Sequence, residues 1–315
     1  MTKTLYGTHP NGSEVYAYTL ENGELKVRFL PLGAAIDELW VPNSHGKLSN
    51  VLVGHADLAD RITNNFAQGE ICGRVCNRIS GAKFSLNGEE FNLTPSDEGQ
   101  YTLHGAKEFN TALWHVAHVD DNSIVFTYTS PAGTHGFPGT VQTKVRYTLE
   151  ASTVLIEYEA VSDADTVINV TNHAYFNLAG TGSGQIFNQL LCIDAEHYLP
   201  LNDELCPTGE VASVAGTQFD FRQFREIGQA YDVNFCNPRA IEAIDPESGR
   251  RMMVETDLPG VQLYTGDCLP EPFSGFCLET QYWPDAPNQP DFPSIVVRAG
   301  EVWRSWTKFS FDTVS

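Results

Sequence analysis

The stretch VQTKVRYTL, residues 141–149, places apolar and polar side chains alternately along the chain. A period of two is typical of a β-strand that has one face on a hydrophobic core and the other in water. Residues 123–129 and 154–161, on either side of it, are rich in β-branched and aromatic side chains. We therefore expect the three segments to be neighbouring strands of one sheet.

Tight turns separate further strand-like segments. Asn22-Gly23 lies between residues 15–20 and 24–29, and Asn87-Gly88 lies between residues 83–86 and 89–93. Asn-Gly supplies the positive φ angles of a short hairpin loop. Helical periodicity is confined to residues 57–61 and 221–227. No repeat or linker interrupts this pattern, so we expect a single domain over residues 1–315, an all-β antiparallel sandwich with few short helices.

Composition excludes several classes of function. Forty acidic against nineteen basic side chains give a formal net charge of −21, which disfavours nucleic acid and membrane surfaces as partners. The sequence contains no run of about 18 apolar residues, so we expect no membrane-spanning helix. The seven cysteines have no regular spacing, and the N-terminus has no apolar leader. These features predict reduced thiols and a cytoplasmic location.

Ionisable residues stand within otherwise apolar sequence in three stretches. They are residues 73–79 (GRVCNRI), followed by 103–105 (LHG), residues 170–178 (VTNHAYFNL) and residues 276–288 (FCLETQYWPDAPN). A buried Arg, His or Glu is costly unless it is paired, so each one alone is equally well explained as a structural polar group. Three such stretches together predict one polar site within a sheet. Metal is not expected, because Cys72 and Cys76 lack the second ligand pair of a structural zinc site.

The order of these blocks closely resembles the aldose 1-epimerase (galactose mutarotase) family. Matching blocks are GRVxNRI, LHG, TNHxYFNL, PGVQxYTG and LETQxxPDAPN, in family order from about residue 25 to the C-terminus. The resemblance implies a β-supersandwich fold and an enzyme that interconverts the α and β anomers of free hexoses such as galactose and glucose. It implies that the enzyme needs neither a metal nor a cofactor. It also implies a monosaccharide substrate as the partner, and a protein that is a monomer or a homodimer.

The resemblance also implies roles for individual residues. The general base falls on Glu279 and the general acid on His173, which together can deprotonate O1 of a sugar and protonate its ring oxygen. The positions that bind hydroxyls or the ring oxygen fall on Asn77, Arg78, His104, Tyr175, Asp232 and Gln262.

One position departs from the family pattern. Val233 stands where a histidine follows the aspartate in the family. We expect Val233 to leave Asp232 freer to move, so that both glucose and galactose are accepted.

Other interpretations of the same residues stay open. Arg78 and Asp232 can form a salt bridge with each other, and His104 can be a core histidine. A non-catalytic sugar-binding sandwich is a second possibility, although it has no need of the Glu279–His173 pair.

Two further enzyme classes are alternatives. A glycoside hydrolase needs two carboxylates that flank the glycosidic bond, and Asp232 or Asp267 are candidates to partner Glu279. Against it, His173 occupies the acid position. An epimerase of a phosphorylated or otherwise modified sugar needs extra basic residues, and these are scarce outside residues 74–83. The acidic composition fits a neutral hexose better.

Overall fold

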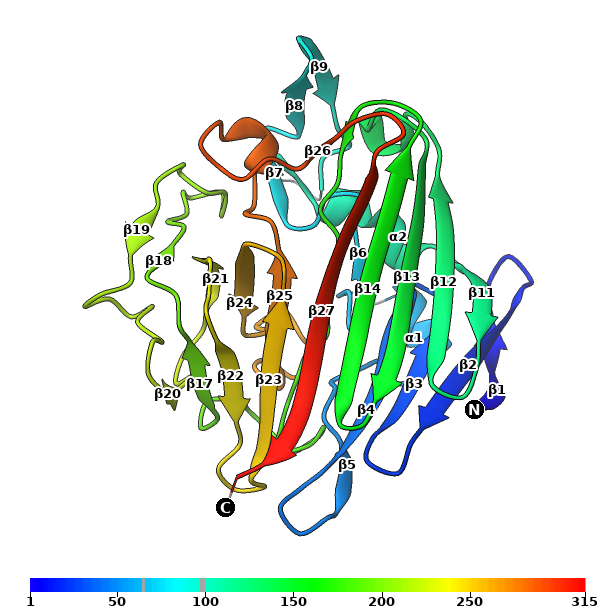
Figure 1. Cartoon of the computed structure of the whole chain (residues 1–315), viewed down its shortest axis with the longest axis vertical. Helices are drawn as coiled ribbons and strands as arrows, with labels where there is room; N and C mark the ends of the chain where they lie inside the picture. The colour runs from blue at the N-terminus through cyan, green and yellow to red at the C-terminus, as the bar shows by residue number, and fades with distance from the viewer. Residues whose placement is uncertain (64–65, 97–99, 315) are drawn as a thin grey trace.

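Antiparallel sheets make up most of the molecule (Figure 1), a computed structural model that describes residues 1–63, 66–96 and 100–314. The expected all-β fold is confirmed. Every pairing between neighbouring strands in these ranges is antiparallel.

The largest sheet has nine strands. In spatial order they are β11 (His115–Val119), β12 (Ser123–Ser130), β13 (Val141–Glu150), β14 (Thr153–Ser162), β27 (Val302–Thr313), β23 (Arg250–Thr256), β22 (Ile241–Ile244), β17 (Leu190–Ile193) and β20 (Arg225–Glu226). The strand expected over residues 141–149 is β13, with β12 and β14 as its predicted neighbours. Val145 faces Phe126 on one side and Tyr158 on the other. All three are buried, because odd positions of β13 face the core.

Two five-stranded sheets accompany the large one. The first runs in the order β1 (Thr2–Thr8), β2 (Glu14–Glu21), β3 (Lys26–Leu30), β4 (Ala35–Pro42) and β5 (Leu48–Asn50). The second runs in the order β19 (Ala212–Ser213), β18 (His197–Tyr198), β21 (Asp232–Cys236), β24 (Gly260–Tyr264) and β25 (Cys277–Gln281). The first predicted hairpin is confirmed as β2–β3. The second is confirmed as the pair β8 (Lys83–Leu86) and β9 (Glu89–Asn92).

Short elements complete the described chain. Three further strand pairs are β6 (Ile71–Cys72) with β16 (Thr171–Asn172), β7 (Arg78–Ser80) with β10 (Tyr101–Leu103), and β15 (Thr166–Val167) with β26 (Val296–Val297). The helical segments are α1 (Leu58–Thr63), η1 (His104–Lys107), α2 (Glu108–Thr111), η2 (Thr134–Gly136) and η3 (Ala286–Asn288). Within the described ranges, none of these helices has the length and apolar character needed to cross a bilayer.

One of the two predicted helices is wrong. The helix expected at residues 57–61 overlaps α1, but residues 221–227 contain strand β20 instead. Leu191 of β17 pairs with Arg225, and the Ile227 amide donates to the carbonyl of Gln189. Hydrogen bonds to the edge of the large sheet therefore override a weak local periodicity.

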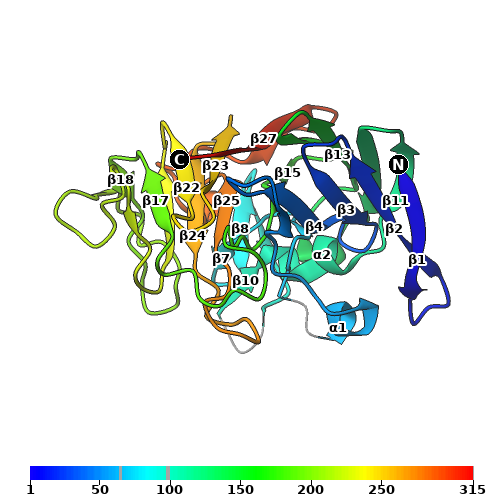
Figure 2. The same ribbon diagram turned by 90° about the horizontal axis from the view of Figure 1, so that it is seen from below.

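The main core lies between the large sheet and the two smaller ones (Figure 2). In this view β27 and β13 lie along one side of the molecule, with β4 and β25 beneath them. One apolar cluster includes Val27 of β3, Leu278 of β25 and Phe309 of β27. Thr280 of β25 also points to the large sheet, where its hydroxyl lies 2.6 Å from that of Thr307. The odd positions of β25 consequently face away from the large sheet.

Candidate active site

A cavity of about 550 Å³ opens on the face of β21, β24 and β25 that is turned away from the large sheet. Seven of the eight predicted site residues line it, namely Asn77, Arg78, His104, His173, Tyr175, Asp232 and Glu279. They come from segments far apart in the sequence, so the prediction that the ionisable stretches converge is confirmed.

The pairing register of β21, β24 and β25 positions the acidic residues of this cavity. Gln262 on β24 pairs with Glu279 on β25, while the adjacent Val261 and Leu263 are buried in the main core. Gln262 itself does not line the cavity. Its amide nitrogen donates to Asp232 Oδ1 at 2.5 Å, so Gln262 orients the carboxylate of Asp232. Gln262 is the direct cross-strand neighbour of Glu279, and a contact between its side chain and a sugar stays a prediction.

The second carboxylate oxygen of Asp232 also has a partner. Arg78 Nη1 lies 3.3 Å from Asp232 Oδ2, so the salt bridge left open by the sequence does form. Both residues still line the cavity. Val233 is buried in the core opposite Leu263, because consecutive residues of a strand face opposite ways. Our expectation that Val233 frees Asp232 to move is therefore wrong in its physical reason.

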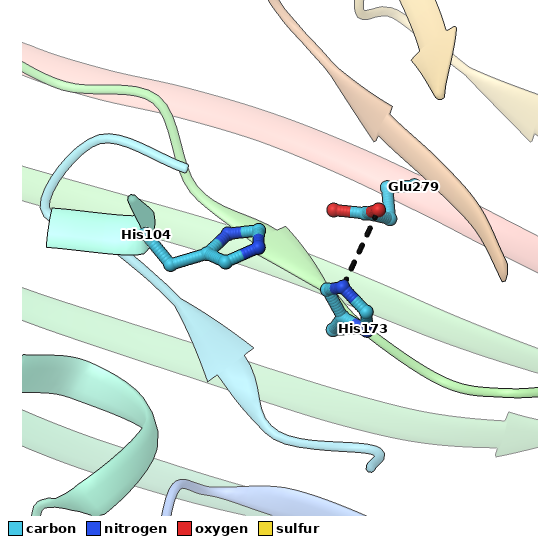
Figure 3. A group of neighbouring side chains, drawn as sticks. All are labelled: His104, His173 and Glu279. Atoms are coloured by element: carbon cyan, nitrogen blue, oxygen red, sulfur yellow. Dashed lines mark ion pairs between the residues drawn. The ribbon is translucent and has the colours of Figure 1, made fainter. Parts of the chain in front are cut away.

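His173 directly follows β16, and backbone bonds fix it. Its amide donates to the carbonyl of Glu70 at 2.9 Å, and the amide of Gly69 donates to its carbonyl at 3.0 Å. The imidazole then points to the edge strand β25, where Nε2 lies 3.4 Å from Glu279 Oε1 (Figure 3). Both side chains are almost completely buried, with 4% and 2% of their residue surface exposed.

His104 lies beside this pair, with 5.1 Å between its ring centroid and that of His173 (Figure 3). Its Nδ1 accepts a hydrogen bond from the backbone amide of Asn77 at 3.1 Å, and its own amide donates to the Asn77 carbonyl. An accepting Nδ1 leaves the ring hydrogen on Nε2, so His104 is a hydrogen-bond donor. Gly105 permits this geometry: it has a φ of +62°, and a Cβ there would lie 2.3 Å from the Gly73 carbonyl oxygen.

Burial sets the protonation states of the side chains that line the cavity. It raises the pKa of Glu279 to about 8, with a further contribution from Asp232 and an opposing one from Arg78. Burial also lowers the pKa of His173 to about 4, and it lowers the pKa of His104 well below its ordinary value. Near neutral pH, the cavity wall therefore holds a carboxylic acid beside two neutral imidazoles.

Two histidines and a carboxylate also resemble a set of metal ligands. His104, His173 and Glu279 offer one potential ligand atom each within 4.8 Å of one another. A histidine that binds a metal through one nitrogen normally donates a hydrogen from the other. In His104 the Nδ1 atom accepts the Asn77 amide instead. The tautomer of His104 thus fits a hydrogen-bond donor to a ligand and not a metal ligand.

Some basic residues flagged by the sequence lie elsewhere. Arg74 is fully buried and donates to the carbonyls of Pro138 and Gly139. Lys83 forms an exposed pair with Glu90. Neither lines the cavity.

Sequence reasoning missed several lining residues. They include Phe66, Lys107, Tyr231, Tyr264 and Cys268. Lys107 follows the LHG block, and Tyr264 belongs to PGVQxYTG, so proximity to a matched block was the available signal. Asp267, which lines the cavity as well, accepts the Tyr264 hydroxyl hydrogen at 2.6 Å.

Comparisons with known proteins agree on one family. The family model for aldose 1-epimerase matches residues 16–310. The galactose mutarotase of Rattus norvegicus is 38% identical, and the alignment covers 98% of each chain. The aldose 1-epimerase of Haemophilus influenzae is 33% identical over 96% of this chain and 97% of its own. The crystal structure of a galactose 1-epimerase from Lactobacillus acidophilus has the same fold, with a TM-score of 0.88 at 23% identity over 100% of this chain and 99% of its own.

Proposed function

The chain belongs to the aldose 1-epimerase family, and we propose that it interconverts the α and β anomers of free hexoses, galactose and glucose among them, by acid–base ring opening and reclosure. Family membership makes it an enzyme, a carbohydrate isomerase. The observation that carries the mechanism is the buried His173–Glu279 contact of 3.4 Å on the wall of the cavity.

Ring opening requires a base at O1 and an acid at the ring oxygen O5. Ionised Glu279 takes the O1 proton while the imidazolium of His173 gives a proton to O5. The products are the open-chain aldehyde, a carboxylic acid and a neutral imidazole. After rotation about C1–C2, His173 takes the proton from the O5 hydroxyl as O5 attacks C1, and Glu279 returns its proton to O1. The other anomer results, and both groups regain their initial charge.

The protonation states of Glu279 and His173 are compatible with this cycle. Burial favours protonated Glu279 and neutral His173, the state that the closure step uses. The state for ring opening contains the same number of protons, with one moved from the carboxyl to the imidazole. Sugar hydroxyls that donate to the carboxylate favour its ionised form, so substrate binding promotes this transfer.

The remaining polar residues suit an uncharged sugar. Arg78 and Asp232 present charged groups to hydroxyls, and His104 presents its Nε2 hydrogen to an oxygen acceptor. Only Arg78 and Lys107 bring positive charge to the described lining, and Arg78 already pairs with Asp232. A phosphorylated sugar is therefore the less favoured substrate. We further propose a cytoplasmic, cofactor-free and metal-free enzyme that acts as a single domain over residues 1–315.

Polarimetry of freshly dissolved α-galactose and α-glucose, with and without the purified protein, tests this function. Glu279→Gln and His173→Asn should each fold and bind sugar, yet lose at least about 100-fold in rate, which is the lower range for general acid or base catalysis. Because the two residues act as a unit, the double variant should be scarcely slower than either single one. Glu255→Gln, at an exposed position of β23, serves as the control. Near-parental rates in folded Glu279→Gln protein would contradict the mechanism.

A further inference from the structure

Both ring nitrogens of His173 face the same strand. Nε2 lies 3.4 Å from Glu279 Oε1, and Nδ1 lies 3.5 Å from the sulfur of Cys277. Cys277 and Glu279 are two residues apart on β25, so their side chains leave the same face of the strand. Cys277 is completely buried and shares an apolar cluster with Tyr175.

We propose that Cys277 is a positioning residue for the epimerase reaction, whose sulfur accepts the Nδ1 hydrogen of His173 and so confines proton exchange to Nε2. This inference rests on the proposed function, because it takes His173 to be the acid that protonates the ring oxygen.

The proton balance of the reaction identifies the sulfur as the acceptor. An imidazolium that releases its Nε2 proton to O5 becomes a neutral ring with its hydrogen on Nδ1. In a buried site this hydrogen needs an acceptor, and the Cys277 sulfur is within reach. If the thiol instead donated to Nδ1, the neutral ring would hold its hydrogen on Nε2. Release of that hydrogen would leave an imidazolate, which is not accessible near neutral pH.

The weakness of a thiol as an acceptor suits an acid catalyst. Burial raises the pKa of Cys277 well above its ordinary value, so the side chain remains an uncharged thiol. A carboxylate in this place would stabilise the imidazolium and make it a poorer acid. An uncharged sulfur orients the ring without that stabilisation. The low pKa of His173 is consistent with such a partner.

Other titratable groups surround the pair on every side. The groups facing the imidazole, besides Glu279 and Cys277 of β25, are His104 of η1, Tyr175 of its own segment and Tyr264 of β24. The groups that act on the carboxyl of Glu279 are Asp232 of β21 and Arg78 of β7. Glu279 in turn acts on the buried thiols of Cys72 and Cys76. A shift in the pH profile is therefore interpretable only beside a direct readout of the imidazole.

Nitrogen-15 NMR of the histidine side chains gives that readout. At pH 7, well above the pKa of about 4, the His173 signals should report hydrogen on Nδ1 and none on Nε2. The His173→Asn spectrum assigns the signals by their absence. In Cys277→Ala the Nδ1 hydrogen loses its acceptor, so the fraction of rings with hydrogen on Nε2 should rise, whereas in Cys277→Ser the hydroxyl oxygen should keep the hydrogen on Nδ1. Hydrogen on Nε2 in the parent, or an unchanged tautomer in Cys277→Ala, would overturn the inference.

Steady-state kinetics provide a second, independent test of the role of Cys277. Loss of one hydrogen bond in Cys277→Ala should lower kcat about tenfold and leave KM unchanged. The acid limb of the pH profile should also move to lower pH, because the imidazolium loses an acceptor. Cys277→Ser should stay within about threefold of the parent in kcat. Cys236→Ala is the matched control, since it truncates a thiol that is 3% exposed in a separate apolar cluster. Equal kcat values and pH profiles in folded Cys277→Ala and the parent would refute the role.

Failure of this inference is distinguishable from failure of the proposed function. If His173→Asn is inactive while Cys277→Ala behaves like the parent, the acid is assigned correctly and only the role of the thiol is wrong. If folded His173→Asn keeps near-parental activity, the proposed mechanism itself is wrong, whatever the thiol variants do.

Discussion

Replacing Glu279 by glutamine should make the protein more stable above pH 6.5 at the same time as it removes most of the activity. The carboxyl of Glu279 is buried at 2% exposure beside a second acidic group, Asp232, and its pKa is raised to about 8. The unfolded chain ionises this carboxyl at a far lower pH. Ionisation therefore favours the unfolded state, and a glutamine of similar shape cannot ionise.

The size of the effect follows from proton linkage. Between the ordinary value of 4.5 and about 8, the folded protein binds one more proton at this site than the unfolded chain does. The free energy of unfolding then falls by about 1.4 kcal/mol per pH unit. His173, with its lowered pKa, acts in the opposite direction, but only between about 4 and 6.5. From pH 6.5 to 8 Glu279 acts alone, and the parent should lose about 2 kcal/mol relative to Glu279→Gln.

Paired urea unfolding curves at pH 6.5, 7.0, 7.5 and 8.0 measure this difference. Groups that titrate identically in both proteins cancel when one curve is subtracted from the other. Glu255→Gln, which replaces an exposed carboxyl on β23, should give a difference that does not change over the same range. Polarimetry on the same samples should show the loss of at least about 100-fold in rate.

Parallel stability curves for the parent and Glu279→Gln would refute the reasoning. Glu279 would then be ionised in the folded protein throughout the range. The neutral acid that we assign to the closure step would have to form only after the sugar is bound.

Three further changes test other parts of the site. Asp232→Asn should raise KM or lower kcat by roughly tenfold with an unchanged pH profile, because Asp232 orients a hydroxyl and does not exchange protons. If the pH–rate profile of Asp232→Asn lost its acid or its basic limb, Asp232 would instead be a catalyst that exchanges protons. Gly105→Ala should lower the free energy of unfolding by about 2 kcal/mol or more. The added Cβ would lie 2.3 Å from the Gly73 backbone, and a φ of +62° is strained for alanine. A urea midpoint equal to that of the parent would contradict this. Dialysis against EDTA should leave polarimetric activity unchanged, because the Asn77 amide occupies Nδ1 of His104; activity lost on dialysis and restored by zinc would show that the metal-free assignment is wrong.

Local pattern was sufficient for much of the fold. The alternation in residues 141–149 predicted β13 because every second side chain of that strand does enter the core. The helix predicted at residues 221–227 was wrong because the pairing partner of this segment, Leu191, lies far away in the sequence. A short apolar pattern has no information about such a partner. Strand order and the position of the cavity are likewise products of long-range pairing.

The site was predictable as a set of residues but not as a geometry. Matched blocks named Glu279 and His173, and the structure brings them within 3.4 Å. The hydrogen bond from Gln262 to Asp232 was not predictable, because it depends on which residue of β24 pairs with which residue of β21. Cys277 was not among the predicted site residues. Its spacing of two from Glu279 was the available signal, since strand neighbours at i and i+2 share a face.

The two faces of β25 separate two kinds of selection. Leu278 and Thr280 pack against the large sheet, whereas Cys277, Glu279 and Gln281 face the opposite way. A complete mutational scan of this strand should therefore show a period of two, with abundance sensitive at even positions and turnover per folded molecule sensitive at Cys277 and Glu279.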